Sequence, residues 1–333
     1  MMKILNPKMI PDMKSKDLRI VFMGTPEFAV ESLKALLVSG KNIVGVITAP
    51  DKPSGRGKQL QSSPVKDFAL KQNLNLFQPV NLKDPEFVSS LAALKPDLNI
   101  VVAFRMLPEI VWSLPVMGTF NLHASLLPDY RGAAPINRVI MNGEKETGVT
   151  TFLINHEIDT GNILLQEKTT IGTNETAGEL HDRLMTIGAR LVNETVDAFA
   201  SNSIKPVPQN AFTINQPLKT APKIFKDDCR IKWDSPVEKV YNFIRGLSPY
   251  PAAYTEFMSS NERHLIKIYF ADKVFMNHSV APGTIETDSK KILRISAAGG
   301  YLDIRSLQMA GKRRLNTEEF LRGFAGLEKF KAF

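Results

Sequence analysis

The alternation of apolar and polar residues predicts two differently built halves. From Leu18 an apolar, strand-like run leads through a Gly-Thr-Pro turn into apolar residues at helical spacing. Residues 42–50 form a second strand-like run, and a helical pattern followed by a strand-like one recurs over residues 63–79 and 87–104. Strands joined by helices are usually parallel, because each connection must cross the sheet. We therefore predict an α/β, doubly wound, Rossmann-like sheet over residues 18–205.

The pattern changes after a segment rich in proline. Residues 201–222 hold four prolines and many polar residues without clear periodicity, so we expect a linker at 206–222. Residues 223–333 consist of short strand-like runs separated by Gly, Asn and Pro, with one helical stretch at 235–247. Many short strands with turn signals predict a small barrel or sandwich as the second domain.

Length and composition indicate a two-domain protein of the cytoplasm. A chain of 333 residues exceeds the usual limit of one apolar core. We expect residues 1–17 to be an N-terminal tail, because they lack the apolar core and cleavage site of a secretory signal. The apolar runs are too short to cross a membrane, and the single Cys229 permits neither an internal disulfide nor a thiolate metal cage. We expect no metal and a monomer.

The net charge of +8 is concentrated in the C-terminal part. Residues 1–209 hold 22 Lys and Arg against 21 Asp and Glu, whereas residues 210–333 hold 20 against 13, an excess of seven. Clustered cations favour a polyanionic partner, because counterions are released when they meet phosphates. A basic surface that only keeps the protein soluble is the alternative.

Residues 121–137, NLHASLLPDYRGAAPIN, place two polar side chains at the end of an apolar strand. Asn121 and His123 are two positions apart, so on an extended strand they point the same way. An amide N–H can stabilise an oxyanion, and an imidazole beside it can donate a hydrogen bond or transfer a proton. The pair alone is weak evidence for chemistry, and a structural hydrogen-bonded pair is the favoured interpretation of it.

Three further segments are candidates for chemistry or binding. Asp159 lies in an Asp-Thr-Gly turn, where its carboxylate either orients His123 or bonds its own backbone. The basic loop, residues 49–66, contains Lys52, Arg56, Lys58 and Lys66, and either closes on phosphates or is a flexible connection. The turn at 22–28, FMGTPEF, lacks the glycines of a dinucleotide fingerprint and the ending of a P-loop. We interpret it as a tight turn in which Gly24 supplies an unusual backbone angle.

In this order, the segments resemble the methionyl-tRNA formyltransferases from about Leu18 to the end of the chain. The resemblance rests on FMGTPEFAV, APDKPSGRGKQL with SPVK, NLHASLLPDYRGAAPIN, ETGVT and IDTGNILL, and in the second domain on IKWDS, SPYPAA, APGTI and LQMAGKR. It implies transfer of a formyl group from 10-formyltetrahydrofolate to the α-amino group of initiator methionyl-tRNA, without a metal. It also implies that the second domain is a barrel of oligonucleotide-binding (OB) type that holds the tRNA backbone.

The resemblance assigns roles to particular residues. The family's catalytic Asn, His and Asp fall on Asn121, His123 and Asp159. Its folate-contacting Ser-Leu-Leu-Pro falls on Ser125, Leu126, Leu127 and Pro128, and the part of the basic loop that reaches the tRNA acceptor end falls on Arg56 and Lys58.

The chain departs from many relatives at two places. Arg105 follows Phe104 where relatives usually read A-Y-G-x-x-L-P, and Asp129-Tyr130 replaces Arg-Trp. The first departure concerns the wall of the folate pocket and the second removes a cation, although Arg131 remains.

Two other functions are compatible with parts of the pattern. A sugar-nucleotide N-formyltransferase shares Asn121, His123 and Asp159, but the basic loop and the basic second domain argue against it. A non-catalytic RNA-binding relative fits the charge, but it does not explain the complete Asn, His and Asp set.

Overall fold

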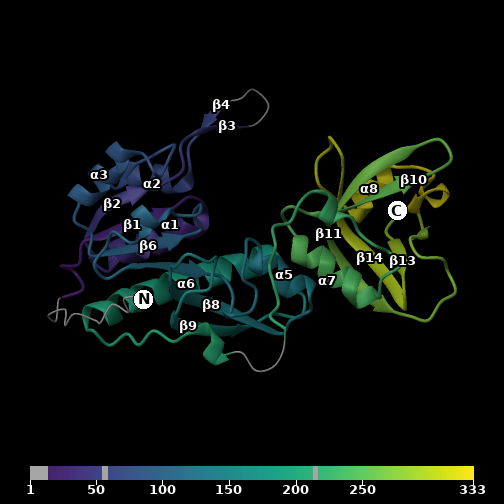
Figure 1. Ribbon diagram of the computed structural model, residues 1–333. Helices are drawn as coiled ribbons and strands as arrows, with labels where there is room; N and C mark the ends of the chain where they lie inside the picture. The colour runs from purple at the N-terminus through teal and green to yellow at the C-terminus, as the bar shows by residue number, and fades with distance from the viewer. Residues whose placement is uncertain (1–13, 55–58, 213–216) are drawn as a thin grey trace. The chain divides into compact units, whose positions relative to one another are not determined.

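The computed structural model describes residues 14–54, 59–212 and 217–333 of the chain, whose course Figure 1 shows. The chain divides into two compact units, here called the first and the second unit. The first consists of Met1–Arg131, Gly148–Thr169 and Asp182–Lys219, and the second of Gly132–Thr147, Thr170–His181 and Thr220–Phe333.

A seven-stranded sheet with the order β5-β2-β1-β6-β7-β8-β9 is the core of the N-terminal part. Its strands are β1 (Ile20–Gly24), β2 (Ile43–Ile47), β5 (Leu76–Phe77), β6 (Leu98–Val102), β7 (Thr119–His123), β8 (Glu146–Leu153) and β9 (Ile163–Thr170). The strands from β5 to β7 are parallel, and β8 runs antiparallel to β7. The predicted doubly wound sheet is therefore confirmed, whereas the antiparallel β8 was not predicted.

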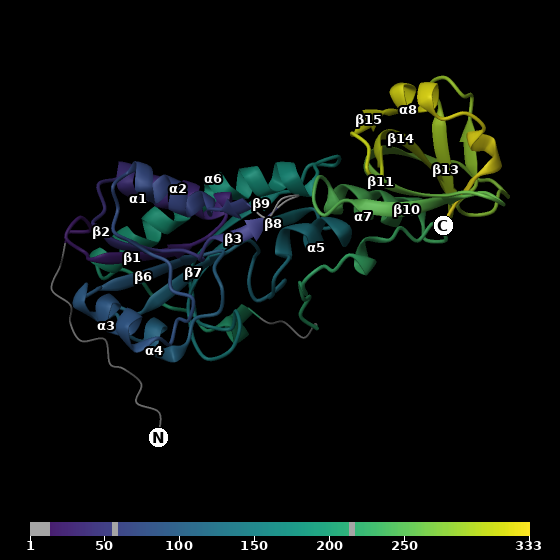
Figure 2. The ribbon, with the colours of Figure 1, turned by 90° about the horizontal axis from the view of Figure 1, so that it is seen from above.

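Helices cover both faces of this sheet, as Figure 2 shows for α1 and α6 on one face and α3 and α4 on the other. The helices of this part are α1 (Glu27–Val38), α2 (Pro64–Lys71), α3 (Pro85–Ala93), α4 (Glu109–Trp112) and α6 (Ala177–Ala200), whereas α5 (Pro135–Met141) belongs to the second unit. Ser63 and Asp84 cap α2 and α3, and each is followed by a proline at the first helical position. All of β1 and β6 is buried, as expected for strands covered on both faces.

The turn after β1 corrects one expectation about Gly24. Its backbone is not in the left-handed region. A Cβ there would instead lie 2.5 Å from the Cβ of Ala29 and 3.0 Å from the Val102 carbonyl oxygen. Glycine is needed because α1 and β6 approach the turn closely, and not because of an unusual backbone angle.

The second unit contains an antiparallel sheet with the order β12-β13-β14-β11-β10-β16, and β15 pairs with β14. The elements are α7 (Val237–Leu247), β10 (Ala253–Met258), β11 (Arg263–Phe275), β12 (Ile285–Thr287), β13 (Leu293–Ala297), β14 (Gly300–Met309), β15 (Leu315–Asn316), α8 (Thr317–Gly323) and β16 (Lys331–Ala332). A bridge between Thr284 and Lys331 joins the two ends of the sheet and nearly closes it. The predicted small β-barrel of OB type is confirmed.

Candidate functional site

Asn121 and His123 lie at the carboxyl end of β7, near the middle of the parallel sheet. His123 is buried and Asn121 is half-buried. Their positions on one strand put both side chains on the same face. Among the residues that the structure describes, none exchanges a hydrogen bond with the Asn121 side chain. Its amide can therefore be offered to a substrate, and ligands of open α/β sheets bind at this edge.

The two nitrogens of the His123 ring face different groups. Nε2 lies 2.8 Å from the carbonyl oxygen of Tyr130, and Nδ1 lies 3.9 Å from Oδ2 of Asp159. A carbonyl oxygen only accepts, so Nε2 must carry a proton and donate it to Tyr130. In the neutral ring, Nδ1 then has a lone pair directed toward the Asp159 side, which makes it the nitrogen available for proton transfer.

Tyr130 and Asp159, whose groups flank the His123 ring, both have an unusual backbone conformation. Tyr130 has φ of 61° and Asp159 has φ of 55°, in the left-handed region that residues other than glycine rarely adopt. A Cβ on Gly161 would lie 1.6 Å from the Leu153 carbonyl oxygen, so the Asp-Thr-Gly turn passes tightly against β8. Backbone of this kind persists only where surrounding contacts hold it, and it clusters at functional sites.

The segment Ser125–Pro128, predicted to contact folate, is held from behind by Thr150 of β8. The Thr150 hydroxyl donates to the Ser125 carbonyl at 2.7 Å and accepts from the Leu127 N–H at 3.2 Å. Gln166 donates to both the Leu127 carbonyl and the Thr150 hydroxyl, at 2.8 and 2.9 Å. The Leu127–Pro128 peptide is cis, and the Ser125 hydroxyl donates to the Asp129 carbonyl. These hydrogen bonds attach the turn to β8 and β9.

Asp129 and Tyr130, which differ from the Arg-Trp of many relatives, both form hydrogen bonds that hold the backbone in this chain. The Asp129 carboxylate accepts from the backbone N–H of Lys219 at 2.9 Å, and the Tyr130 N–H donates to the Lys219 carbonyl at 2.6 Å. Residue 219 thus pairs with both residues that follow the Ser-Leu-Leu-Pro turn. At residue 129 this chain therefore has a carboxylate in place of the cation of many relatives, and this carboxylate binds the backbone of Lys219.

The departure at Phe104–Leu107 is also fixed by hydrogen bonds. The Arg105 guanidinium donates to the Val80 carbonyl at 2.8 Å and also to the Pro79 carbonyl. Burial lowers the pKa of Arg105 below its usual value. Leu107 is buried in the core beneath α3 and α4. Arg105 therefore ties the loop after β6 to the segment after β5.

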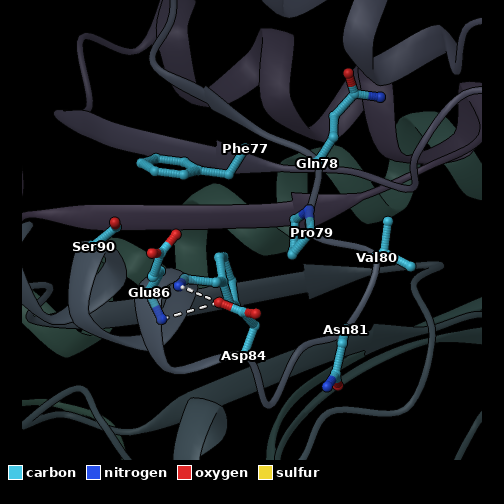
Figure 3. A pocket seen from close by; sticks show the side chains of 9 residues that line it. Phe77, Gln78, Pro79, Val80, Asn81, Asp84, Glu86 and Ser90 are labelled. Carbon is cyan, nitrogen blue, oxygen red and sulfur yellow. Dashed lines mark hydrogen bonds between the residues drawn. The ribbon is translucent and has the colours of Figure 1, made fainter.

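A cavity of about 460 Å³ lies beside this segment, and its lining includes Phe77, Pro79 and Val80 (Figure 3). Its lining also includes Asp84 and Glu86. The Asp84 carboxylate accepts from two N–H groups of α3, so the helix N-terminus is already capped. None of the predicted catalytic residues lines this cavity, and we do not assign it to the reaction.

The basic loop contains a short antiparallel pair, β3 (Lys52–Ser54) and β4 (Gln59–Gln61). Arg56 and Lys58, the predicted tRNA contacts, lie outside the described residues. At its base the Asp51 carboxylate accepts from Lys66 at 2.5 Å and from Gln78 at 2.9 Å. The hydrogen bond from Lys66, followed by that from Gln78, lowers the pKa of the Asp51 carboxyl. Lys66 is therefore paired with Asp51 at the base of the loop.

Sequence reasoning missed three residues that hold the site: Thr150, Gln166 and Gln209. Gln209 is buried in a segment expected to be a linker, and it bonds to the Asp159 turn and to Arg131. Thr150 ends the ETGVT segment, but neither that segment nor the sequence around Gln166 and Gln209 indicates the role of these side chains, because each bonds to backbone distant in sequence. Within the described ranges, no group of three or more His, Cys, Asp or Glu side chains is placed to hold a metal. No helix in those ranges is long and apolar enough to span a bilayer.

Comparisons with known proteins agree on one family. Residues 18–196 match the formyl transferase family and residues 223–325 match its C-terminal domain. Methionyl-tRNA formyltransferase from Bacteroides thetaiotaomicron is 54% identical over 320 residues, which cover 96% of this chain and 99% of the relative. The enzyme of the same name from Flavobacterium johnsoniae is 47% identical and covers 95% and 99%.

Solved structures share the fold at lower identity. A sugar 3N-formyl transferase crystallised with dTDP and 5-N-formyl-THF has a TM-score of 0.61 at 23% identity, covering 89% of this chain and 99% of that one. An N-formyltransferase from Helicobacter canadensis has a TM-score of 0.62 at 21% identity, covering 89% and 100%. These likenesses concern the fold, whereas the near full-length identity to the tRNA enzymes is far higher. The chain belongs to the methionyl-tRNA formyltransferase family.

Proposed function

We propose that this enzyme transfers the formyl group of 10-formyltetrahydrofolate to the α-amino group of initiator methionyl-tRNA. The proposal is supported by Asn121 and His123, which share a face at the carboxyl end of β7, and by Asp159, whose Oδ2 lies 3.9 Å from His123 Nδ1. The donor is supported by the family and by proteins of similar fold crystallised with 5-N-formyl-THF or tetrahydrofolic acid. The acceptor is supported by the names of the close relatives.

The proposed reaction is an addition and elimination at the formyl carbon. The neutral amine attacks that carbon, a C–N bond forms, and the carbonyl oxygen becomes an oxyanion. The Asn121 amide donates to this oxyanion, a type of contact that contributes roughly 100-fold to 1000-fold in rate. The bond to N10 of the folate then breaks, and N10 receives a proton as it leaves.

His123 and Asp159 handle the proton in this scheme. The Tyr130 carbonyl holds Nε2–H, so Nδ1 accepts the proton that the amine loses and returns it to N10. The Asp159 carboxylate, 3.9 Å from Nδ1, stabilises the imidazolium that forms between these steps. This separation exceeds a hydrogen bond, so the Asp159 carboxylate does not bind Nδ1 directly.

Binding is assigned to three parts of the chain. Ser125, Leu126, Leu127 and Pro128 form the turn that follows His123 and contact the folate. Arg56 and Lys58 of the basic loop reach the acceptor end of the tRNA. The barrel at 223–333, with residues 206–222 as its connection to the catalytic domain at 18–205, holds the tRNA backbone through its excess of positive charge. The enzyme acts as a monomer in the cytoplasm, where charged tRNA is found.

The test is single-turnover formyl transfer with 10-formyltetrahydrofolate and charged initiator tRNA. His123→Ala and Asp159→Asn should each lower the rate at least about 100-fold, and Asn121→Ala by about 100-fold to 1000-fold. His156→Ala is the matched control, because His156 is a surface histidine with a 67% exposed side chain. Wild-type rates in the His123→Ala variant would refute the assignment.

The same assay separates the two alternatives. Formylation of a nucleotide-linked amino sugar, without formylation of charged tRNA, would favour a sugar-nucleotide N-formyltransferase. Binding of tRNA without transfer by the wild-type protein would favour a non-catalytic RNA-binding relative.

A further inference from the structure

Gln209 lies in a segment whose composition is that of a linker, yet its side chain is only 4% exposed. It begins the short 3-10 helix Gln209–Phe212. Two residues earlier, Val207 exchanges both backbone hydrogen bonds with Ile163 at the start of β9, each at 2.8 Å. This bridge fixes the path of the chain just before Gln209.

The side-chain amide of Gln209 forms hydrogen bonds to two separate loops, through both of its N–H donors and its acceptor oxygen. Nε2 donates to the carbonyl oxygens of Asp159 and Gly161, both at 2.8 Å. Oε1 accepts from Nε and Nη2 of Arg131 at 3.0 and 2.5 Å. A primary amide has two N–H groups and an oxygen with two lone pairs, so these four bonds use its full capacity. One buried side chain therefore joins the two loops.

These are the loops that flank the His123 ring. Asp159 carries the carboxylate that faces Nδ1, and Arg131 directly follows Tyr130, whose carbonyl accepts from Nε2. Both Asp159 and Tyr130 have positive φ, so local backbone preference does not hold either residue in place. The bonds of Gln209 act on the backbone of Asp159 itself and on the side chain that follows Tyr130.

We propose that Gln209 is a positioning residue for the transfer reaction, setting the distance between the Asp159 turn and the Tyr130 turn and thereby the tautomer and orientation of His123. It does not touch the reacting groups. The inference rests on the roles proposed above for His123 and Asp159. A displacement of about 1 Å at a reacting group can cost roughly 100-fold in rate, so loss of this link should reduce kcat more than substrate binding.

The test compares Gln209→Leu with Gln72→Leu, the same change at an exposed glutamine that ends α2. We expect Gln209→Leu to lower kcat about 10-fold to 100-fold while KM for each substrate changes less than about 3-fold. Gln72→Leu should retain wild-type kcat and KM. A rise in KM with unchanged kcat would overturn the proposal, since it would indicate a substrate contact.

A readout independent of activity is the ¹⁵N spectrum of the His123 ring. In the wild type we expect a single Nε2–H tautomer, and in Gln209→Leu a mixture of tautomers. If Gln209→Leu only lowers Tm and leaves kcat and the tautomer unchanged, Gln209 is structural and the proposal fails. If His123→Ala is active, the proposed function fails, but the tautomer result still tests the link.

A double-mutant cycle with Arg131→Leu tests the two-loop connection. Because Gln209 and Arg131 act through one link, the kcat losses of the single variants should not multiply in the double variant. Losses that multiply fully would show that the residues act separately and would overturn the connection.

Discussion

Thr150→Val tests whether the hydroxyl of Thr150 holds the Ser-Leu-Leu-Pro turn in place. Thr150 is fully buried, pairs with His123 across the two strands, and binds the Ser125 carbonyl and the Leu127 N–H. Valine keeps the shape and removes the hydroxyl. Each buried polar group that loses its partner costs about 1–3 kcal/mol, so the two backbone groups together predict a loss of about 2–6 kcal/mol in the free energy of unfolding. Gln166 loses one of its hydrogen bonds as well.

Thr147→Val is the matched control on the same strand. Thr147 is also buried, but its hydroxyl has no hydrogen-bond partner among the described residues. Replacing it should leave stability unchanged or raise it slightly, because no bond is lost and an unpaired polar atom is removed. The two variants therefore share a chemical change and differ only in the bonds that it breaks.

Urea unfolding followed by circular dichroism measures the difference, and amide hydrogen exchange locates it. We expect the free energy of unfolding to fall only for Thr150→Val, with faster exchange at the Leu127 N–H. On the proposed function, KM for the folate should rise in the same variant, because the turn that contacts it loosens. Equal stability of the two variants would refute the reasoning.

Two further predictions concern the Asp-Thr-Gly turn and the reacting amine. Gly161→Ala would place a Cβ 1.6 Å from the Leu153 carbonyl oxygen, so it should lower kcat and reduce the free energy of unfolding by about 2 kcal/mol or more. Gly323→Ala is the control and should change neither quantity, because a Cβ there meets nothing within 4 Å. Equal thermal melts of the two variants would contradict this prediction. The single-turnover rate should rise with pH from about 5.5 to about 7.5, because only the neutral amine attacks and an α-amino group titrates near 8; a flat profile over this range would count against amine attack.

The sequence predicted the sheet because its strands and helices alternate with clear periodicity. It also predicted that Asn121 and His123 share a face, since residues two apart on a strand must do so. It did not predict that β8 is antiparallel, because an apolar run does not encode the direction in which a strand enters the sheet. It failed for Gln209 because composition describes the average of a segment, whereas burial of one side chain depends on its partners.

The departures at Arg105 and Asp129 show the same limit. Each differs from the usual family pattern at a position expected to contact a ligand. In the structure, each side chain binds backbone instead: Arg105 binds the carbonyls of residues 79 and 80, and Asp129 binds the N–H of Lys219. A changed residue near a site therefore need not change the chemistry of that site.

The hydrogen bonds around His123 explain why many of the groups that fix this ring and its neighbouring loops are backbone groups. The Tyr130 carbonyl has no proton to give, so it can fix only the Nε2–H form of the ring, and this leaves Nδ1 facing Asp159. A hydroxyl side chain at that point could also donate a hydrogen bond and would permit the other tautomer. Selecting one form of the ring then depends on keeping a single carbonyl in place, which is why the loops on both sides of His123 are bound to Lys219 and Gln209.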